Sequence, residues 1–235
     1  MAILCPSIKA AYTPIPKAAC TTIKTVIYKV NNENSGGARF LPSSLAQRVP
    51  FRRKSIHSRE GYRTLSNVAA GQPPEDYTWF SVIRNPAFRV ISAWRNKANE
   101  AVFRAQNEEI DIIDYGLKLN PTLPEFIWNY HAYRTISKPI RRHTEPFAFY
   151  LGQSLSRYDK LFPVEDLNLF QEWFEARLHR RIPMPKINAS NKPIRMNLCK
   201  KDIEELLILL RDDFDLLHAH YDVSATFDRL AEQCA

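Results

Sequence analysis

Residues 8–30 of this 235-residue chain read IKAAYTPIPKAACTTIKTVIYKV, and they contain the clearest secondary-structure pattern of the sequence. Residues 8–15 are apolar and compatible with a β-strand, which the turn-forming residues 16–22 end. Four apolar side chains then follow at the i, i+3, i+4, i+7 spacing of a helix with one buried face: Ile23, Val26, Ile27 and Val30. We therefore predict a strand, a turn and a helix in this order.

A second unit of the same kind begins at residue 77. Residues 77–83, YTWFSVI, are typical of a buried strand, and Arg84-Asn85-Pro86 separates them from a helical pattern over residues 87–105. We also predict a strand at 158–164, helices at 110–117, 123–136, 167–178, 200–220 and 225–233, and a basic loop at 138–143. Because strands alternate with helices, we expect an α/β fold with a largely parallel sheet.

The composition favours one globular domain over residues 1–235, since 45% of the residues are hydrophobic. A basic loop is expected at about 31–76, where Asn, Ser, Gly and Pro replace the apolar pattern and a basic run extends from Arg48 to Arg63. The longest apolar runs stay far below the ~18 residues of a membrane span. The N-terminus has no basic segment ahead of an apolar core, so we expect neither a transmembrane segment nor a secretory signal.

The cysteines indicate a reduced environment. Cys5, Cys20, Cys199 and Cys234 lie far apart and form no CxxC pair, which argues against a zinc ribbon and a disulfide framework. The six histidines likewise show no zinc-ligand spacing. We therefore expect a cytoplasmic protein that needs no metal.

The net charge favours anionic partners. The chain has 33 Lys and Arg residues against 25 Asp and Glu residues, a formal charge of +8. Nucleic acid, phosphorylated cofactors, acidic sugars and a membrane surface are all compatible with this charge. A nucleic-acid-binding domain is the weaker alternative, because no aromatic or basic readout motif is present.

The turn at residues 16–22 is a candidate anion site. A turn that leads into a helix presents free backbone N–H groups and the positive end of the helix dipole. Lys17, Thr21 and Thr22 would add a charge and two hydroxyls. The alternative is a solvated lysine beside threonines that cap the helix. The chain lacks GxxxxGK[ST], and none of its six glycines lies in this turn, which disfavours a nucleotide triphosphatase.

The turn at residues 84–86 is a second candidate anion site. Arg84 ends a strand, and Arg89 and Ser92 lie three residues apart on the following helix, so that they share a face. An arginine fork with a hydroxyl suits a phosphate monoester. In the alternative, these residues form a solvated basic face with Ser92 as a small packing residue.

Together the two turns resemble the carbohydrate sulfotransferases of the Golgi type. Residues 15–24 resemble their 5′-phosphosulfate loop, and residues 83–97 resemble their 3′-phosphate motif, close to RxPxxRxxSAxxxK. Residues 143–146, HTEP, resemble the HWxP segment of the chondroitin and HNK-1 group, with Thr144 in place of tryptophan. Residues 158–167, Asn188-Ala189-Ser190 with Lys192-Pro193, and the helix with Asp212 and Asp213 resemble the rest of that group's pattern. The chain is similar to a soluble, bacterial-type member.

The resemblance implies a P-loop-like three-layer α/β fold with a central, mainly parallel sheet. It also implies transfer of a sulfuryl group from 3′-phosphoadenosine 5′-phosphosulfate (PAPS) to a hydroxyl of a glycan or glycolipid. Lys17 would stabilise the leaving group, and Arg84 and Ser92 would bind the 3′-phosphate. The backbone N–H groups of the remaining loop residues, with the threonine hydroxyls, would bind the 5′-phosphate: Ala18, Ala19, Cys20, Thr21 and Thr22.

In-line transfer also needs a base that takes the proton of the acceptor hydroxyl, and histidine suits this role near neutral pH. His143 is the candidate, because it matches the histidine of the HWxP segment. His57 in the basic loop, Glu60 and Glu145 are the alternatives. A small-molecule or nucleotide kinase is the alternative enzyme, which the missing GK[ST] motif disfavours. The acceptor itself stays open.

Overall fold

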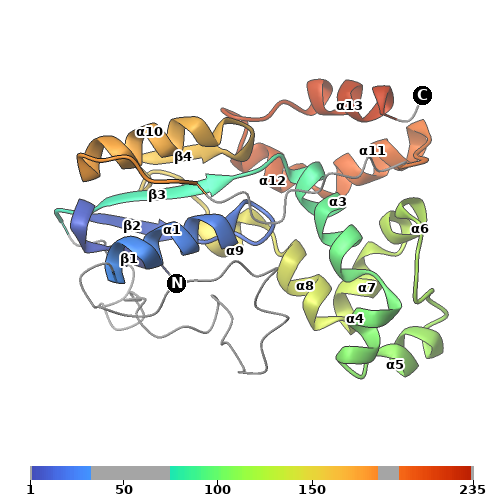
Figure 1. Ribbon diagram of the computed structural model, residues 1–235. Coiled ribbons are helices and arrows are strands. Elements are labelled where there is room, and N and C mark those ends of the chain that lie inside the picture. The colour runs from blue at the N-terminus through green and yellow to red at the C-terminus, as the bar shows by residue number, and fades with distance from the viewer. Residues whose placement is uncertain (1, 33–74, 185–195, 234–235) are drawn as a thin grey trace. The chain divides into compact units, whose positions relative to one another are not determined.

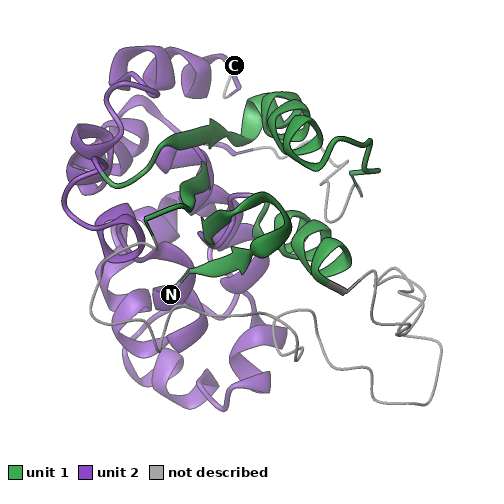
Figure 2. Ribbon diagram, turned by 90° about the vertical axis from the view of Figure 1, so that its left-hand side faces the viewer, with its two compact units in different colours: residues 1–14, 19–82, 157–189 green, residues 15–18, 83–156, 190–235 purple. Residues whose placement is uncertain are grey.

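The computed structural model describes residues 2–32, 75–184 and 196–233. The chain divides into two compact units, coloured separately in Figure 2. Unit 1 comprises residues 1–14, 19–82 and 157–189, and unit 2 comprises residues 15–18, 83–156 and 190–235. Each unit has its own hydrophobic core.

Unit 1 contains a mixed sheet with the strand order β1-β2-β3-β4. These strands are β1 (Ile3–Cys5), β2 (Ala10–Thr13), β3 (Thr78–Ile83) and β4 (Lys160–Pro163). β2 runs parallel to β3, with Ala10 opposite Thr78, and β1 runs antiparallel to β2. The predicted strand over residues 8–15 is shorter than expected, because the 3₁₀ helix η1 (Pro6–Ile8) reverses the chain just before it.

Two helices cover one face of this sheet, α1 (Cys20–Asn32) and α10 (Leu167–Leu178), the second preceded by the 3₁₀ helix η6 (Val164–Asp166) (Figure 1). Alternate strand residues and the apolar stripes of both helices share one buried cluster, which includes Tyr12, Phe80, Val82, Ile23, Val26, Ile27, Phe170 and Phe174. The opposite face carries Ala11 and Trp79, and Tyr158 packs edge-on against Trp79. The apolar residues that alternate along the strands and those that recur every helical turn are therefore buried together in this core.

Unit 2 is helical. Its elements are α3 (Pro86–Lys97), α4 (Glu100–Ala105), α5 (Glu109–Asp114), α6 (Leu123–Trp128), α7 (Tyr130–Ile136), α8 (Lys138–Thr144), α9 (Phe147–Leu151), α11 (Lys200–Leu209), α12 (Arg211–Leu216) and α13 (Val223–Glu232). One apolar cluster joins residues of α3 to residues of α6, α7 and α11. Part of this core therefore comes from segments about 100 residues apart in the sequence.

Several predicted helices are confirmed but divided. The helix predicted over 87–105 breaks at Ala98, and the side chain of Asn99 accepts a hydrogen bond from Val102 N to begin α4. The helix predicted over 123–136 breaks at Asn129, and the helix over 200–220 breaks at Leu210. The helical spacing of apolar residues persists across these breaks, so periodicity alone did not reveal them.

The loop predicted over residues 138–143 is wrong, because these residues belong to α8. The side chain of Ser137 accepts from Ile140 N at 3.5 Å and caps the helix, and Pro139 occupies the first turn, where no N–H is needed. The sequence does contain this helix-start signal, Ser137 followed by Pro139, but the basic composition of residues 138–143 favoured a loop instead. The basic run 48–63 with His57 and Glu60, and the segment 188–193, lie outside the described residues.

Candidate functional site

The turn between β2 and α1 has an unusual backbone. Lys17 has φ 68° and Ala19 has φ 51°, so two residues other than glycine adopt the left-handed conformation. Each costs about 1–2 kcal/mol, and such residues cluster at ligand-binding sites. Ala18 N donates to Ile15 O at 3.3 Å, and Ile23 N donates to Ala19 O at 3.1 Å as the helix begins. Although the turn contains no glycine, Lys17 and Ala19 supply its left-handed conformations.

The first turn of α1 presents backbone donors. By helix geometry, the N–H groups of Cys20, Thr21 and Thr22 have no acceptor within the helix, and the helix dipole makes this end positive. The Thr25 hydroxyl donates to Thr21 O at 2.8 Å and secures the same turn. The predicted 5′-phosphate residues therefore include the start of a regular helix.

Unit 2 brings Arg84 to Lys17. Arg84 Nη1 donates to the Lys17 carbonyl at 3.1 Å, so the residue after β3 braces the turn after β2. The neighbouring Asn85 caps α3, since its Oδ1 accepts from Ala87 N at 3.0 Å, and its Nδ2 donates to Thr226 Oγ1 at 2.7 Å. The backbone of Arg84 therefore lies next to an anchored residue, Asn85, while its side chain reaches the Lys17 turn.

Ser92 and Arg89 do not form the expected pair. Ser92 is half-buried on α3, whereas Arg89 is fully buried and its guanidinium contacts Asp213 and the backbone carbonyl of Glu145. The guanidinium of Arg89 is therefore engaged in the core and is not exposed beside Ser92. The apolar neighbours of Arg89 on α3 draw it into the core, where only buried partners can balance its charge.

His143 lies in the last turn of α8 with its ring fixed. Its Nδ1 lies 2.7 Å from Pro139 O, so Nδ1 carries the proton and Nε2 carries the lone pair. Burial, together with the charges of Lys97, Lys17 and Arg142, lowers the pKa of His143 to about 4, while the hydrogen bond to Pro139 O opposes this shift. His143 is therefore neutral at pH 7 and lies within electrostatic range of Lys17.

The other described alternative base is engaged by a cation. Glu145 Oε2 accepts from Arg134 Nη2 at 2.8 Å, and both side chains are mostly buried. Lys97, Arg134 and Asp213 were given no site role from the sequence, although Lys97 is the last residue of the RxPxxRxxSAxxxK match. A single sequence carries no signal that pairs residues 89 and 213.

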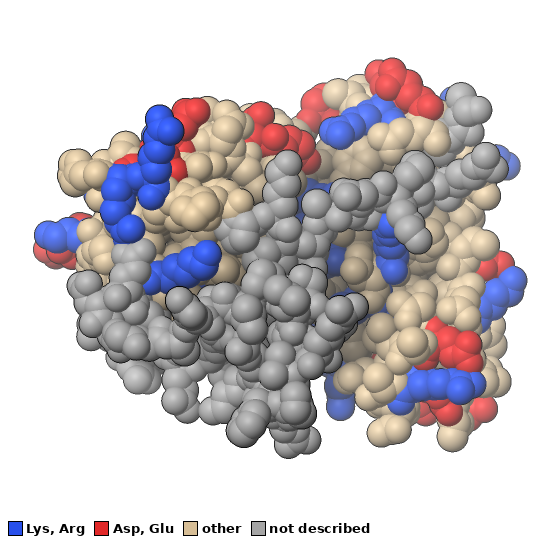
Figure 3. Space-filling model, in the orientation of Figure 1, with Lys and Arg blue, Asp and Glu red and all other residues tan. Residues whose placement is uncertain are grey.

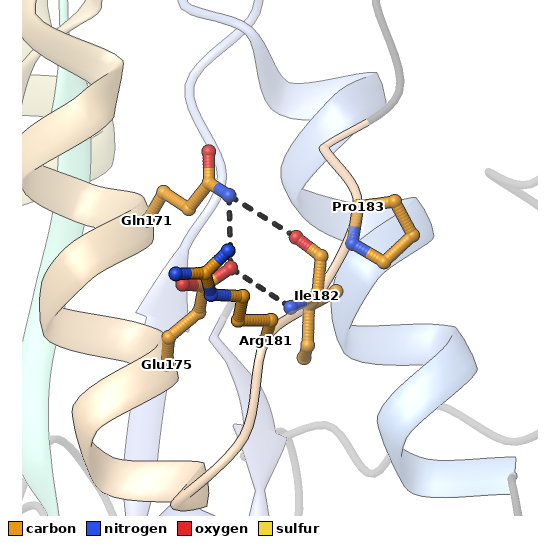
Figure 4. A pocket seen from close by; sticks show the side chains of 5 residues that line it. All are labelled: Gln171, Glu175, Arg181, Ile182 and Pro183. Atoms are coloured by element: carbon orange, nitrogen blue, oxygen red, sulfur yellow. Dashed lines mark hydrogen bonds between the residues drawn. The ribbon is translucent and has the colours of Figure 1, made fainter.

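A hollow of about 470 Å³ lies in unit 1 at the end of α10 (Figure 4). Its lining residues are Gln171, Glu175, Arg181, Ile182 and Pro183. Glu175 Oε1 accepts from Gln171 Nε2 and from Ile182 N, each at 2.8 Å, and these bonds lower the pKa of Glu175. None of the predicted site residues lines this hollow.

The surface charge is mixed. On the face shown in Figure 3, the described Lys and Arg side chains lie among acidic and uncharged ones. Within the described ranges, no three His, Cys, Asp or Glu side chains are grouped to hold a metal ion. Among the helices described, none is long and apolar enough to cross a membrane.

Comparison with known proteins identifies the family. No curated protein and no solved structure matches the chain significantly. A family model described as "Sulfotransferase family" matches residues 1–222, nearly the whole chain. The match spans every segment on which the sequence resemblance rests, from residues 15–24 to the helix with Asp212 and Asp213. The chain therefore belongs to the sulfotransferase family.

Proposed function

We propose that this protein transfers the sulfuryl group of PAPS to a hydroxyl of a carbohydrate or glycolipid. The observation that carries the proposal is the grouping in unit 2 of Lys17, Arg84 and His143. Arg84 contacts the Lys17 backbone, and the charge of Lys17 acts on the His143 ring. A cation for the leaving group and a neutral base thus occur in one compact unit.

The donor would bind through two anion sites. Lys17 and the N–H groups from Ala19 to Thr22 bind the 5′-phosphate, because the left-handed turn and the helix start both favour an anion. Ala18 N, which the sequence also suggests as a donor, is already bonded to Ile15 O. Arg84 and Ser92 bind the 3′-phosphate. Arginine suits this task, since its planar fork matches phosphate oxygens. These cations and helix N–H groups neutralise the phosphates without a metal ion.

In the proposed reaction, His143 Nε2 takes the proton of the acceptor hydroxyl as the acceptor oxygen bonds to sulfur. The bond between sulfur and the 5′-phosphate oxygen breaks, and its electron pair leaves on adenosine 3′,5′-bisphosphate. Lys17 stabilises the charge on that oxygen, an effect present only as the bond breaks. The proton remains on His143 until solvent removes it.

The low pKa of His143 is compatible with this role. The ring is unprotonated at neutral pH, so its Nε2 lone pair is available, but with a pKa of about 4 it is a weak base before the donor binds. The bound donor adds negative charge near Lys17 and Lys97, which opposes the two lysine charges that lower the pKa. Donor binding would therefore raise the basicity of His143 just before transfer.

The proposal is tested by calorimetry with adenosine 3′,5′-bisphosphate in EDTA, beside adenosine 5′-monophosphate and ATP with and without Mg²⁺. We expect binding that is selective for the 3′-phosphate and indifferent to EDTA, followed by transfer from PAPS to members of a glycan panel. A preference for Mg-ATP would support a kinase instead. Binding of nucleic acid that falls steeply with salt, without nucleotide selectivity, would support the other alternative.

A further inference from the structure

A buried ion pair joins two helices of unit 2. Arg89 Nη2 of α3 lies 3.3 Å from Asp213 Oδ2 of α12, and the two side chains are 0% and 5% exposed. Burying two charges removes both from water, and apolar replacements of such pairs are often as stable or more stable. A contribution to folding stability therefore does not explain this pair. The backbone groups that the pair contacts indicate another role.

The pair contacts residues 143–147, at the C-terminal end of α8 and just beyond it. Arg89 Nη2 donates to Glu145 O at 2.6 Å, and Nη1 makes a longer contact of 3.5 Å with His143 O. Asp213 Oδ1 accepts from Phe147 N at 2.6 Å, and the Arg89 guanidinium lies 4.3 Å from the centre of the Phe147 ring. One ion pair thus contacts three backbone groups and one ring within residues 143–147.

Other buried groups fix the rest of α8. Glu108 Oε1 accepts from Lys138 N at 3.0 Å at the start of the helix, and Tyr130 OH donates to Thr144 O at 3.1 Å at its end. A helix of seven residues is not stable alone, and by helix geometry its last carbonyls have no backbone N–H partner within the helix. Side chains of neighbouring elements supply these partners, so the position of α8 depends on them.

We infer that the Arg89–Asp213 pair is a positioning device for His143. The pair holds the C-terminal turn of α8 and thereby sets where the His143 Nε2 lone pair meets the acceptor hydroxyl. This inference rests on the proposed function, in which His143 is the base. Arg89 and Asp213 are positioning residues, because neither touches the reacting atoms.

Two variants test the inference. Asp213→Asn keeps an oxygen for Phe147 N but removes the charge beside Arg89. The double variant Arg89→Met/Asp213→Leu removes both charges and leaves none unpaired, so it keeps the test available if Asp213→Asn does not fold. For each folded variant we expect kcat to fall at least about tenfold while the Kd of adenosine 3′,5′-bisphosphate changes less than about twofold, since small misplacements of a reacting group are costly.

Asp202→Asn is the matched control. Asp202 is a buried residue of α11 in unit 2, where its Oδ1 accepts from Trp128 Nε1 and its Oδ2 from Cys199 N, each at 2.8 Å, and both partners lie away from residues 143–147. We expect this variant to lose thermal stability without losing kcat. The control separates a general weakening of unit 2 from a displacement of α8.

An NMR titration of the His143 ring, assigned with His143→Gln, provides a readout that does not need activity. In both pair variants we expect the pKa of His143 to move from about 4 toward its ordinary value, because the ring leaves its buried position near Lys17 and Lys97. Folded pair variants with unchanged kcat and an unchanged titration would overturn the inference. Absence of transfer by the wild-type protein would instead contradict the proposed function.

Discussion

Arg84 donates a hydrogen bond to the backbone carbonyl of Lys17 across 3.1 Å. Lys17 follows β2 and Arg84 follows β3, and these two strands are parallel neighbours. Parallel strands end at the same edge of a sheet, where ligands of α/β proteins bind. The bond therefore joins the two turns for which the sequence suggests separate phosphate sites, and it couples the conformation of one turn to that of the other.

Replacing Lys17 with alanine should abolish most of the transfer while weakening donor binding less. The lysine charge matters most when negative charge develops on the leaving oxygen, so we expect kcat to fall about 10²–10³-fold. Single-turnover kinetics and calorimetry with adenosine 3′,5′-bisphosphate measure the two effects. Lys9→Ala is the control, since Lys9 pairs with Asp76 at the surface. Unchanged turnover in Lys17→Ala would remove Lys17 from the mechanism.

Ala19→Gly should stabilise the protein, and Ala18→Gly should destabilise it. Ala19 has φ 51°, a conformation that glycine adopts without the penalty of a Cβ, so we expect a gain of up to about 1 kcal/mol in the free energy of unfolding. Ala18 is fully buried, and its loss of a methyl group should cost about 1 kcal/mol. Urea denaturation measures both. Equal losses in the two variants would contradict the left-handed turn.

The sequence predicts much of this architecture because apolar periodicity reflects burial. Residues 77–83 and 167–178 have the spacing of a buried strand and of a helix, and the structure contains β3 and α10 there. The antiparallel β1 escaped prediction because three residues give too short a pattern. The P-loop-like three-layer arrangement and the single domain stay predictions.

The site is only partly readable from the sequence. The turns after the two strands and the family resemblance predict three site residues, Lys17, Arg84 and His143, because local sequence patterns identify such positions. The sequence does not predict the left-handed conformations of Lys17 and Ala19, since the residues that favour this conformation are glycine and asparagine. The burial of Arg89 against Asp213 depends on a contact between segments more than 100 residues apart, which no local pattern encodes.

His143 should make stability depend on pH. The folded protein holds this ring neutral with a pKa of about 4, whereas in the unfolded chain the ring has its ordinary value of 6.5. The unfolded state therefore binds more protons between these values, and the stability contributed by His143 is lost as the pH falls from 6.5 toward 4.

His143→Gln should remove this dependence. We expect the difference in free energy of unfolding between wild type and variant to change by up to about 1.4 kcal/mol per pH unit in that range. Urea denaturation at several pH values measures the difference. His131→Gln is the control, because His131 is exposed. Parallel pH profiles for wild type and His143→Gln would show that His143 is not held neutral.

Ser92→Ala should weaken binding of adenosine 3′,5′-bisphosphate about tenfold and leave adenosine 5′-monophosphate unaffected, since the hydroxyl is proposed to contact only the 3′-phosphate. Arg84→Ala should weaken binding of the bisphosphate more strongly and should also weaken binding of the monophosphate, because Arg84 additionally braces the Lys17 carbonyl.

Asn96→Ala is the matched control for Ser92→Ala, because Asn96 also lies on α3. The Asn96 side chain donates to the Ser92 carbonyl at 2.9 Å, so this variant perturbs the backbone there and spares the Ser92 hydroxyl. Calorimetry with both nucleotides measures the ratio of affinities. Equal losses of affinity for the two nucleotides in Ser92→Ala would contradict the 3′-phosphate assignment. Equal losses in Arg84→Ala alone would mean that Arg84 only stabilises the Lys17 turn and does not bind the 3′-phosphate.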